Sequence, residues 1–364
     1  MLSTAEPVFS FTPNAAPVAA SEREERLVNP GFGRVFTDHM ALVHYSEAKS
    51  WHDAQITARA SLTMDPASSV LHYAQEIFEG LKAYRHADGK IALFRPDANA
   101  RRFRASARRM AMPELPDALF LESIRALVSA DRDWIPDIEG GALYLRPFMF
   151  ASEVFLGVKP SAEYLYMVIA SSVGDYFKGA PSVSLWATRE YTRAAPGGTG
   201  EAKCGGNYAT SLIAQAEAIR NGCDQVVFLD AAERRWVEEL GGMNIFFVFG
   251  DGSMVTPPLG GTILAGITRD SILAIARAEG IAVREERYSI EQWRADAQSG
   301  RLTEAFACGT AAVVTPIGSV KTADGGFAIG GQSIGPLTQR LRDQLVGIQR
   351  GQAADPAGWV RIIE

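Results

Sequence analysis

Residues 197–208 read Gly-Gly-Thr-Gly-Glu-Ala-Lys-Cys-Gly-Gly-Asn-Tyr, and no other stretch of the chain says as much about its fold and chemistry. Lys203 lies in this glycine-rich turn, five residues before Tyr208. Glycine lets the backbone approach a ligand closely and adopt positive φ. A partly desolvated ammonium loses its proton more easily, which suits Schiff-base chemistry. The alternative is a solvated lysine on a surface loop, which is where most lysines lie.

The composition indicates an ordinary globular protein with more than one domain. At 364 residues, two domains are expected. Hydrophobic residues make up 47% of the chain and charged residues 21%, which is typical of globular proteins. A net charge of −6 and a pI near 5.6 argue against a nucleic-acid-binding surface. The chain has only seven lysines, so few compete with Lys203 for a catalytic role.

Cysteine usage and the N-terminus indicate a cytoplasmic protein. The three cysteines, Cys204, Cys223 and Cys308, are odd in number and far apart, so we expect neither a disulfide framework nor a metal site. The first 30 residues lack a basic segment followed by an apolar one, so no secretory signal is visible. No apolar run reaches the roughly 18 residues that a membrane span needs.

Helical and strand patterns alternate along the chain and predict an α/β (α+β) fold of two domains with mixed sheets. We expect a mobile N-terminal arm at 1–30, a smaller domain at 31–173, a connecting loop at 174–181 and a larger domain at 182–364. Two local expectations bear on the site. Val70 to His86 has the pattern of an amphipathic helix, and Thr268 is a candidate N-cap for a helix that ends before Gly280.

Lys203 has candidate partners for pyridoxal phosphate chemistry, which needs a phosphate cradle, an acid at the pyridine nitrogen and a donor to the ring phenolate. A helix start at Thr268 is an anion site by its dipole and free N–H groups, and Arg102 and Thr310 add polar groups. Glu239 precedes a buried strand, where a carboxylate is costly without a cation. Tyr208 is close in sequence. The alternatives are that Thr268 is only a helix cap, that Glu239 is a solvated acid and that Tyr208 only packs against its neighbours.

Eight short motifs resemble those of the branched-chain amino-acid aminotransferases, which are fold-type IV pyridoxal phosphate enzymes. In the second half these are Glu201–Tyr208, Glu239–Asn244, Leu264–Arg269 and Gly309–Ala311, and in the first half Phe36–Met40, Leu71–Tyr73, Ile77–Gly80 and Leu143–Pro147. The resemblance runs in order from about Gly31 to Gly351. It implies reversible transfer of the amino group of leucine, isoleucine or valine to 2-oxoglutarate.

The resemblance also implies roles for the residues around the cofactor. Lys203 forms the Schiff base and later moves the proton, Glu239 holds the pyridine nitrogen protonated, and Tyr208 binds the phenolic oxygen. The phosphate is held by Arg102, Thr310 and the backbone amides of Ile267 and Thr268.

For the substrate, the resemblance implies an apolar pocket, two carboxylate sites and a homodimer. The residues that match this pocket are Phe32, Phe78, Tyr144, Tyr176 and Gly242, and those that match carboxylate sites are Tyr73, Arg146, Thr310 and Ala311. Arg146 matches the arginine that receives the distal carboxylate of glutamate. Leu156 and Val158, together with Tyr73, match residues that reach the pocket from the other subunit.

The chain departs from some relatives, and other activities remain open. Ala312 and Thr315 occupy the positions of a redox-sensitive cysteine pair, and Gly242 replaces a threonine. A D-amino-acid transaminase and an aminodeoxychorismate lyase share this fold. A catalytically inactive pyridoxal-binding protein is a further alternative, against which the intact Lys203, Glu239 and Tyr208 argue.

Overall fold

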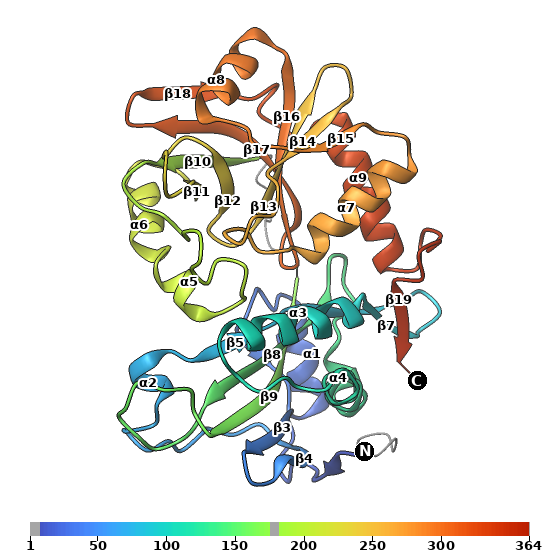
Figure 1. Ribbon diagram of the computed structural model, residues 1–364. Coiled ribbons are helices and arrows are strands. Elements are labelled where there is room, and N and C mark those ends of the chain that lie inside the picture. Colours follow the sequence, from blue (N-terminus) through green and yellow to red (C-terminus); the bar gives the residue numbers. More distant parts are fainter. Residues whose placement is uncertain (1–7, 175–181, 364) are drawn as a thin grey trace. The chain divides into compact units, whose positions relative to one another are not determined.

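Two β-sheets organise the chain into two units (Figure 1). A computed structural model describes residues 8–174 and 182–363. Unit 1 consists of Met1–Tyr176, Ala202–Gly205 and Ile348–Glu364, and unit 2 of Phe177–Glu201 and Gly206–Gly347. The sequence did not indicate that the four residues around Lys203 and the C-terminal segment would belong with the first unit. Apart from Gly174, the expected connecting loop lies outside the described residues.

The sheet of unit 1 has the strand order β1-β4-β3-β9-β8-β6-β7-β19, with β2 beside β9 and β5 beside β8. β1 and β4 run parallel, and the remaining pairs are antiparallel. The strands are β1 (Ser10–Phe11), β2 (Val35–Phe36), β3 (His39–Ser46), β4 (Ser50–Ala58), β5 (Glu76–Phe78), β6 (Leu81–Arg85), β7 (Ile91–Phe94), β8 (Ala142–Ala151), β9 (Glu163–Val173) and β19 (Val360–Ile363).

Two helices, α3 (Pro96–Arg109) and α4 (Asp117–Ala130), pack on this sheet and on each other. Pro96 is the first residue of α3 and Pro116 is the N-cap of α4, because the fixed φ of proline suits a helix start. The rings of Phe103, Phe120 and Tyr166 meet with centroid separations of 5.4, 5.6 and 6.3 Å. These helices close the core of unit 1, and α3 carries Arg102.

The described part of the N-terminal arm is bonded to unit 1. The arm contains β1 and the helix α1 (Ala20–Leu27). The backbone N–H of Asn14 donates to Nε2 of His39 at 3.0 Å, and that of Val18 donates to Oδ1 of Asp38 at 3.0 Å. Trp134 donates its ring N–H to the other oxygen of Asp38. The composition of the arm did not reveal these contacts, because the residues that bind the arm lie on β3 and next to it.

The helix expected from Val70 to His86 is wrong. The helix α2 (Val70–Tyr73) has a single turn. It ends at Ala74, whose φ of 51° is left-handed, and β5 and β6 follow. The helical periodicity was misleading because β5 and β6 both pair with β8, so tertiary pairing overrode the local pattern.

The sheet of unit 2 is mixed and has the strand order β12-β11-β10-β17-β16-β13-β14-β15, with β18 beside β17. β10 runs parallel to both β11 and β17. The strands are β10 (Val183–Thr188), β11 (Gln225–Leu229), β12 (Val237–Leu240), β13 (Asn244–Phe249), β14 (Met254–Thr256), β15 (Val283–Glu285), β16 (Leu302–Gly309), β17 (Val313–Thr322) and β18 (Gly325–Ala328).

Helices cover this sheet and begin close to the candidate site residues. They are α5 (Gly205–Ala209), α6 (Leu212–Arg220), α7 (Ile267–Ala278), α8 (Ile290–Ser299) and α9 (Pro336–Gln349). The expected N-cap at Thr268 is wrong, because Gly266 is the N-cap and Thr268 is the second residue of α7. None of the helices in the described ranges is long and apolar enough to cross a membrane.

Candidate active site

Lys203 is held by its backbone in the core of unit 1. Its neighbours Ala202 and Cys204 are buried, as expected for small fillers. The Lys203 N–H donates to Oγ of Ser106 at 3.0 Å, and its carbonyl accepts the N–H of Phe78 at 2.9 Å. The side chain is half-buried, and Nζ lies 4.7 Å from the centroid of the Phe78 ring. The alternative of a solvated surface loop is therefore excluded.

An ion pair between the fully buried Glu79 and the largely buried Arg102 lies close to this lysine. Both oxygens of Glu79 accept hydrogen bonds from Arg102, from Nε and Nη2, each at 2.7 Å. Asn99 donates to the same carboxylate at 2.8 Å. Burial by itself raises the pKa of Glu79, but Arg102, Asn99 and the charge of Lys203 outweigh it and hold the pKa below its usual value. Glu79 is therefore ionised and orients Arg102.

Three of the predicted pocket residues form an aromatic cluster in unit 1. The rings of Phe32 and Tyr144 meet edge to face with centroids 5.0 Å apart. The guanidinium of Arg146 lies 4.7 Å from the Phe78 ring centroid and donates to the hydroxyl of Tyr144 at 3.0 Å. A Cβ at Gly80 would clash with that hydroxyl, so glycine lets the Tyr144 ring keep this position. The cluster therefore places the Arg146 guanidinium beside the apolar surface of the aromatic rings.

Glu76 is a site residue that the sequence reasoning missed. Its carboxylate accepts the N–H of Gly205, two residues after Lys203. Burial raises the pKa of Glu76, while the Gly205 N–H and the charge of Arg146 oppose that rise. The same side chain would collide with any Cβ at Gly205. Glu76 thus explains one glycine of the opening segment.

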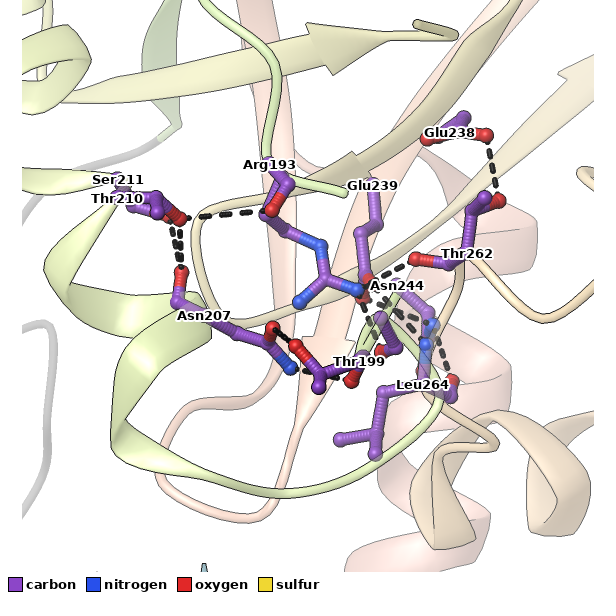
Figure 2. Close-up of polar contacts among 11 residues, drawn as sticks. Arg193, Thr199, Asn207, Thr210, Ser211, Glu238, Glu239, Asn244, Thr262 and Leu264 are labelled. Carbon is purple, nitrogen blue, oxygen red and sulfur yellow. Dashed lines mark hydrogen bonds and ion pairs between the residues drawn. The ribbon is translucent and has the colours of Figure 1, made fainter. Parts of the chain in front are cut away.

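In unit 2, Glu239 lies at the centre of a buried polar network (Figure 2). Nη2 of Arg193 lies 2.6 Å from Oε1 of Glu239, and the N–H of Leu264 donates to the same oxygen at 3.0 Å. Asn244 donates to Oε2 at 3.4 Å and to the carbonyl of Leu264 at 3.0 Å. The alternative of a solvated loop acid is excluded for Glu239. Its neighbour Glu238 binds the hydroxyl of Thr262 at 2.6 Å, and burial raises the pKa of Glu238.

The N-cap of α7 lies two residues after Leu264, which belongs to this network. Gly266, the N-cap, has no side chain with which to cap the helix. A Cβ at Gly266 would clash with the side-chain oxygen of Asn244, so glycine lets Asn244 approach the helix start closely. Ile267 and Thr268 are the first two residues of the helix. A helix N-terminus capped by glycine offers backbone N–H groups and a positive dipole end to an anion.

The remaining candidates of unit 2 lie around the turn between β12 and β13. A Cβ at Gly242 would lie 3.5 Å from Cε1 of Tyr208, so these two residues are in contact range. A Cβ at Gly309 would lie 3.3 Å from Cγ of Met243. Thr310 and Ala311 follow Gly309 at the turn into β17. Unit 2 therefore gathers Glu239, Tyr208, Gly242 and the α7 start.

Tyr73, Leu156 and Val158 lie on an exposed part of unit 1. The hydroxyl of Tyr73 donates to the carbonyl of Leu156 at 2.7 Å. Leu156 and Val158 are exposed by 63% and 89%. Tyr176 lies outside the described residues. Among the residues that the structure describes, no group of three or more His, Cys, Asp or Glu side chains is arranged to hold a metal ion.

Sequence reasoning also missed Arg193 and gave no role to Glu79. Burying either charged side chain without a partner costs free energy, and this cost was the signal that the sequence offered. Arg193 is followed by Ala-Ala-Pro-Gly-Gly, and Glu79 stands among apolar residues before Gly80. Their partners could not be read from the sequence because they lie 46 and 23 residues away, at Glu239 and Arg102.

Comparison with known proteins identifies the class to which this fold and these clusters belong. The model of the class IV amino-transferase family matches residues 76–320. The chain belongs to the class IV aminotransferases, whose cofactor is pyridoxal phosphate.

Within that class the chain falls among the branched-chain-amino-acid aminotransferases. It is 56% identical over 360 residues to a probable branched-chain-amino-acid aminotransferase of Streptomyces coelicolor, covering 98% of this chain and 99% of the relative. It is also 56% identical over 350 residues to the branched-chain-amino-acid aminotransferase of Mycobacterium tuberculosis, covering 94% and 95%.

Solved structures agree with this placement. The branched-chain amino acid aminotransferase of Escherichia coli matches with a TM-score of 0.74 and 28% identity, over 90% of this chain and 99% of that one. The branched-chain amino acid aminotransferase of Thermobaculum terrenum, solved in its PLP-form, matches with a TM-score of 0.69 and 25% identity, over 89% and 98%.

The residues present fit pyridoxal phosphate. The half-buried Lys203 amine supplies a nucleophile for an aldehyde, and the glycine-capped start of α7 suits a phosphate. Arg102 is a cation oriented by a buried carboxylate. The Glu239 carboxylate is buried, held by three donors, and suited to a cationic ring nitrogen.

The Glu79–Arg102 pair generates a stability prediction. Replacing Glu79 with Gln leaves the nearly buried Arg102 guanidinium without its countercharge, and we expect the free energy of unfolding to fall by about 3 kcal/mol or more. Urea unfolding at pH 7 measures it. Because the pKa of Glu79 is lowered in the folded state, its contribution is present at neutral pH and is lost as the pH falls through that lowered pKa.

The matched control is Glu122→Gln, which breaks the more exposed Glu122–Arg125 pair of the same unit. We expect it to change the free energy of unfolding by no more than about 1 kcal/mol. Equal effects of the two substitutions would show that burial of the Glu79–Arg102 pair is unimportant.

Proposed function

We propose that this chain catalyses the reversible transfer of the amino group of L-leucine, L-isoleucine or L-valine to 2-oxoglutarate, giving L-glutamate and the branched-chain 2-oxo acid. The observation that carries the proposal is the setting of Lys203. Its backbone is fixed by Ser106 and Phe78, and its half-buried amine lies over the Phe78 ring beside the Glu79–Arg102 pair. A lysine amine oriented in this way can form a Schiff base with an aldehyde.

Lys203 has two tasks in this proposal. Its amine would hold the cofactor through the aldehyde, and when free the same amine would remove and return the proton of the substrate Cα. When bound, pyridoxal phosphate withdraws the electron pair that proton removal leaves on Cα. The backbone hydrogen bonds of Lys203 to Ser106 and Phe78 support its orientation for both tasks.

The other candidates hold the cofactor. Arg102, Thr310 and the backbone amides of Ile267 and Thr268 bind the phosphate, since they combine a fixed cation with a glycine-capped helix start. Glu239 binds the ring nitrogen and keeps it protonated. Tyr208, which contacts the Gly242 turn, donates to the phenolic oxygen.

The substrate side chain contacts Phe32, Phe78 and Tyr144, whose rings supply the apolar surface that branched aliphatic chains need. Arg146 receives the distal carboxylate of glutamate or 2-oxoglutarate, and its buried Nε has no hydrogen-bond partner among the described residues. The amides at Thr310 and Ala311 bind the α-carboxylate, with Gly242 leaving room near it. Tyr176 and Tyr73 complete the pocket.

The first test replaces Lys203 with Ala. We expect loss of the visible absorbance of bound pyridoxal phosphate and a fall in amino transfer from L-leucine by a factor on the order of 10³ or more, because both the covalent link and the proton-transfer group are gone. Absorbance spectra and a coupled glutamate assay measure the two effects.

The control for that test is Lys90→Ala, which removes an exposed lysine paired with Asp88 and should leave both readings unchanged. Retention of the absorbance and of amino transfer by the Lys203→Ala variant would refute the proposal. Wild-type activity with D-alanine above that with L-leucine would identify a D-amino-acid transaminase instead.

The second test replaces Arg146 with Met, which keeps an unbranched, flexible side chain and removes its charge. We expect KM for 2-oxoglutarate to rise roughly 10- to 100-fold, because a charge-assisted hydrogen bond is lost. KM for L-leucine should change by less than about 3-fold, since its side chain has no carboxylate. Steady-state kinetics with each substrate varied measure this split.

The matched control is Arg125→Met, which removes an exposed arginine of α4 paired with Glu122. It should leave both KM values unchanged. Equal rises for the two substrates in the Arg146→Met variant would contradict a role for this residue in selecting the distal carboxylate.

An exposed apolar surface on unit 1 supports a proposal about the quaternary structure. Leu71, Tyr73, Val154, Leu156 and Val158 are all exposed. A bridge between Ser68 and Val154 and the hydrogen bond from Tyr73 to Leu156 join α2 to the segment after β8. Apolar surface of this kind marks an interface. We propose that a second copy of the chain covers it and completes the substrate pocket with Tyr73, Leu156 and Val158.

The test replaces Val158 with Asp and measures mass by size-exclusion chromatography with light scattering. We expect twice the 39.3 kDa chain mass for the wild type and a shift toward the monomer, with reduced activity, for the variant. Val28→Asp, at an exposed valine of the same unit, is the control. A monomeric wild-type protein would refute the dimer. We also propose a cytoplasmic location, which the free buried cysteines support.

A further inference from the structure

Arg193 is a buried arginine that the proposed chemistry does not yet use. It lies in the loop after β10 with only 7% of its surface exposed. Its Nη2 lies 2.6 Å from Oε1 of Glu239 and donates to the carbonyl of Thr262 at 2.6 Å (Figure 2). The same nitrogen donates to the carbonyl of Gly200 at 2.7 Å. One guanidinium nitrogen therefore meets three segments of unit 2: the glycine-rich segment before Lys203, strand β12 and the stretch that leads to α7.

Two further donors to the Glu239 carboxylate are neutral groups. Leu264 and Asn244 donate to its oxygens from neutral groups, at 3.0 and 3.4 Å. The neighbouring carboxylate of Glu238 instead accepts the hydroxyl of Thr262 at 2.6 Å. A buried carboxylate held by neutral donors alone tends to take up a proton, whereas an adjacent arginine keeps it ionised.

We propose that Arg193 is a positioning residue that acts through Glu239, keeping the carboxylate charged and aimed so that it can hold a protonated pyridine nitrogen. This inference rests on the proposed function, in which Glu239 binds that nitrogen. Arginine suits the task because its guanidinium stays protonated at every accessible pH.

The direction of the effect follows from where the charge lies. Arg193 touches the carboxylate, so it is nearer to Glu239 than to any ring on the far side of that carboxylate. Its field therefore stabilises the arrangement with a negative carboxylate and a positive ring nitrogen over the arrangement in which the proton has moved to Glu239. Without Arg193 the proton shifts toward Glu239, and the ring loses its power to accept electrons.

The carbonyl contacts give Arg193 a second effect in the same network. Gly200 stands three residues before Lys203, and Thr262 two residues before Leu264. Thr199 donates its hydroxyl to the side-chain oxygen of Asn207 at 2.7 Å, and Asn207 donates back to the Thr199 carbonyl at 2.8 Å. A role as a clamp for these loops is the competing explanation, and it requires donors rather than charge.

Two substitutions separate charge from clamping. Arg193→Lys keeps the positive charge and loses the planar fork, whereas Arg193→Gln keeps N–H donors and loses the charge. Each variant is reconstituted with pyridoxal phosphate labelled with ¹⁵N in the ring, and the ¹⁵N chemical shift reports whether the ring nitrogen is protonated. Single-turnover rates with L-leucine, and the Kd for pyridoxal phosphate, are measured on the same samples.

We expect a protonated ring in the wild type and in Arg193→Lys, and a shift toward the unprotonated value in Arg193→Gln. The single-turnover rate of Arg193→Gln should fall on the order of 10²- to 10³-fold, with a much smaller change in Kd. Glu239→Gln should show the same pattern, a large loss of rate with a small loss of cofactor binding. The double variant Arg193→Gln/Glu239→Gln should be no slower than Glu239→Gln alone, within about 3-fold, because both substitutions remove one interaction.

A ring that stays protonated in Arg193→Gln, or rate losses that multiply in the double variant, would overturn the inference and leave Arg193 as a loop clamp. If Arg193→Gln does not fold, Arg193→Lys decides by itself, since an unprotonated ring in that variant contradicts a role for the charge. A wild-type protein without cofactor-dependent transfer would instead refute the proposed function, so the two failures are distinguishable.

Discussion

Both units are organised around a carboxylate that is out of water and must be paired with an arginine. Glu79 is paired with Arg102 in unit 1, and Glu239 with Arg193 in unit 2. A buried charge without its partner costs several kcal/mol, so each pair constrains the elements that carry it. In unit 1 these are the loop after β5 and helix α3, and in unit 2 strand β12 and the loop after β10. The chemistry proposed for the chain uses one member of each pair.

Three glycines of the site are explained by polar side chains that approach the backbone closely. Gly80, Gly205 and Gly266 each stand where a Cβ would strike a polar atom, on Tyr144, Glu76 and Asn244 respectively. Each glycine therefore lets a polar side chain approach the backbone, rather than providing flexibility. This sharpens the interpretation of the segment around Lys203, whose glycine at 205 makes room for a carboxylate that binds its own N–H.

Local patterns predicted much of the fold, and the motifs supplied the candidate site residues. The alternation of helices and strands and the presence of mixed sheets came from residue patterns alone. The single-turn helix α2, the strands after it and the glycine N-cap of α7 did not. There the outcome depends on pairing with β8 and on the close approach of Asn244 to Gly266, neither of which is a property of the local sequence.

The residues that sequence reasoning missed share one property, which is that they act on other residues rather than on a ligand. Arg193 meets Thr262 across 69 residues, and the N–H of Lys203 meets Ser106 across 97. A motif shows which side chains are reactive, because such residue types stand out among their neighbours in the sequence. It does not show what holds them, because many side chains can supply a hydrogen bond or a countercharge. For an electron sink that depends on one proton at a ring nitrogen, the supporting charge is as necessary as the residue it supports, and Arg193 is the cation that the structure pairs with Glu239.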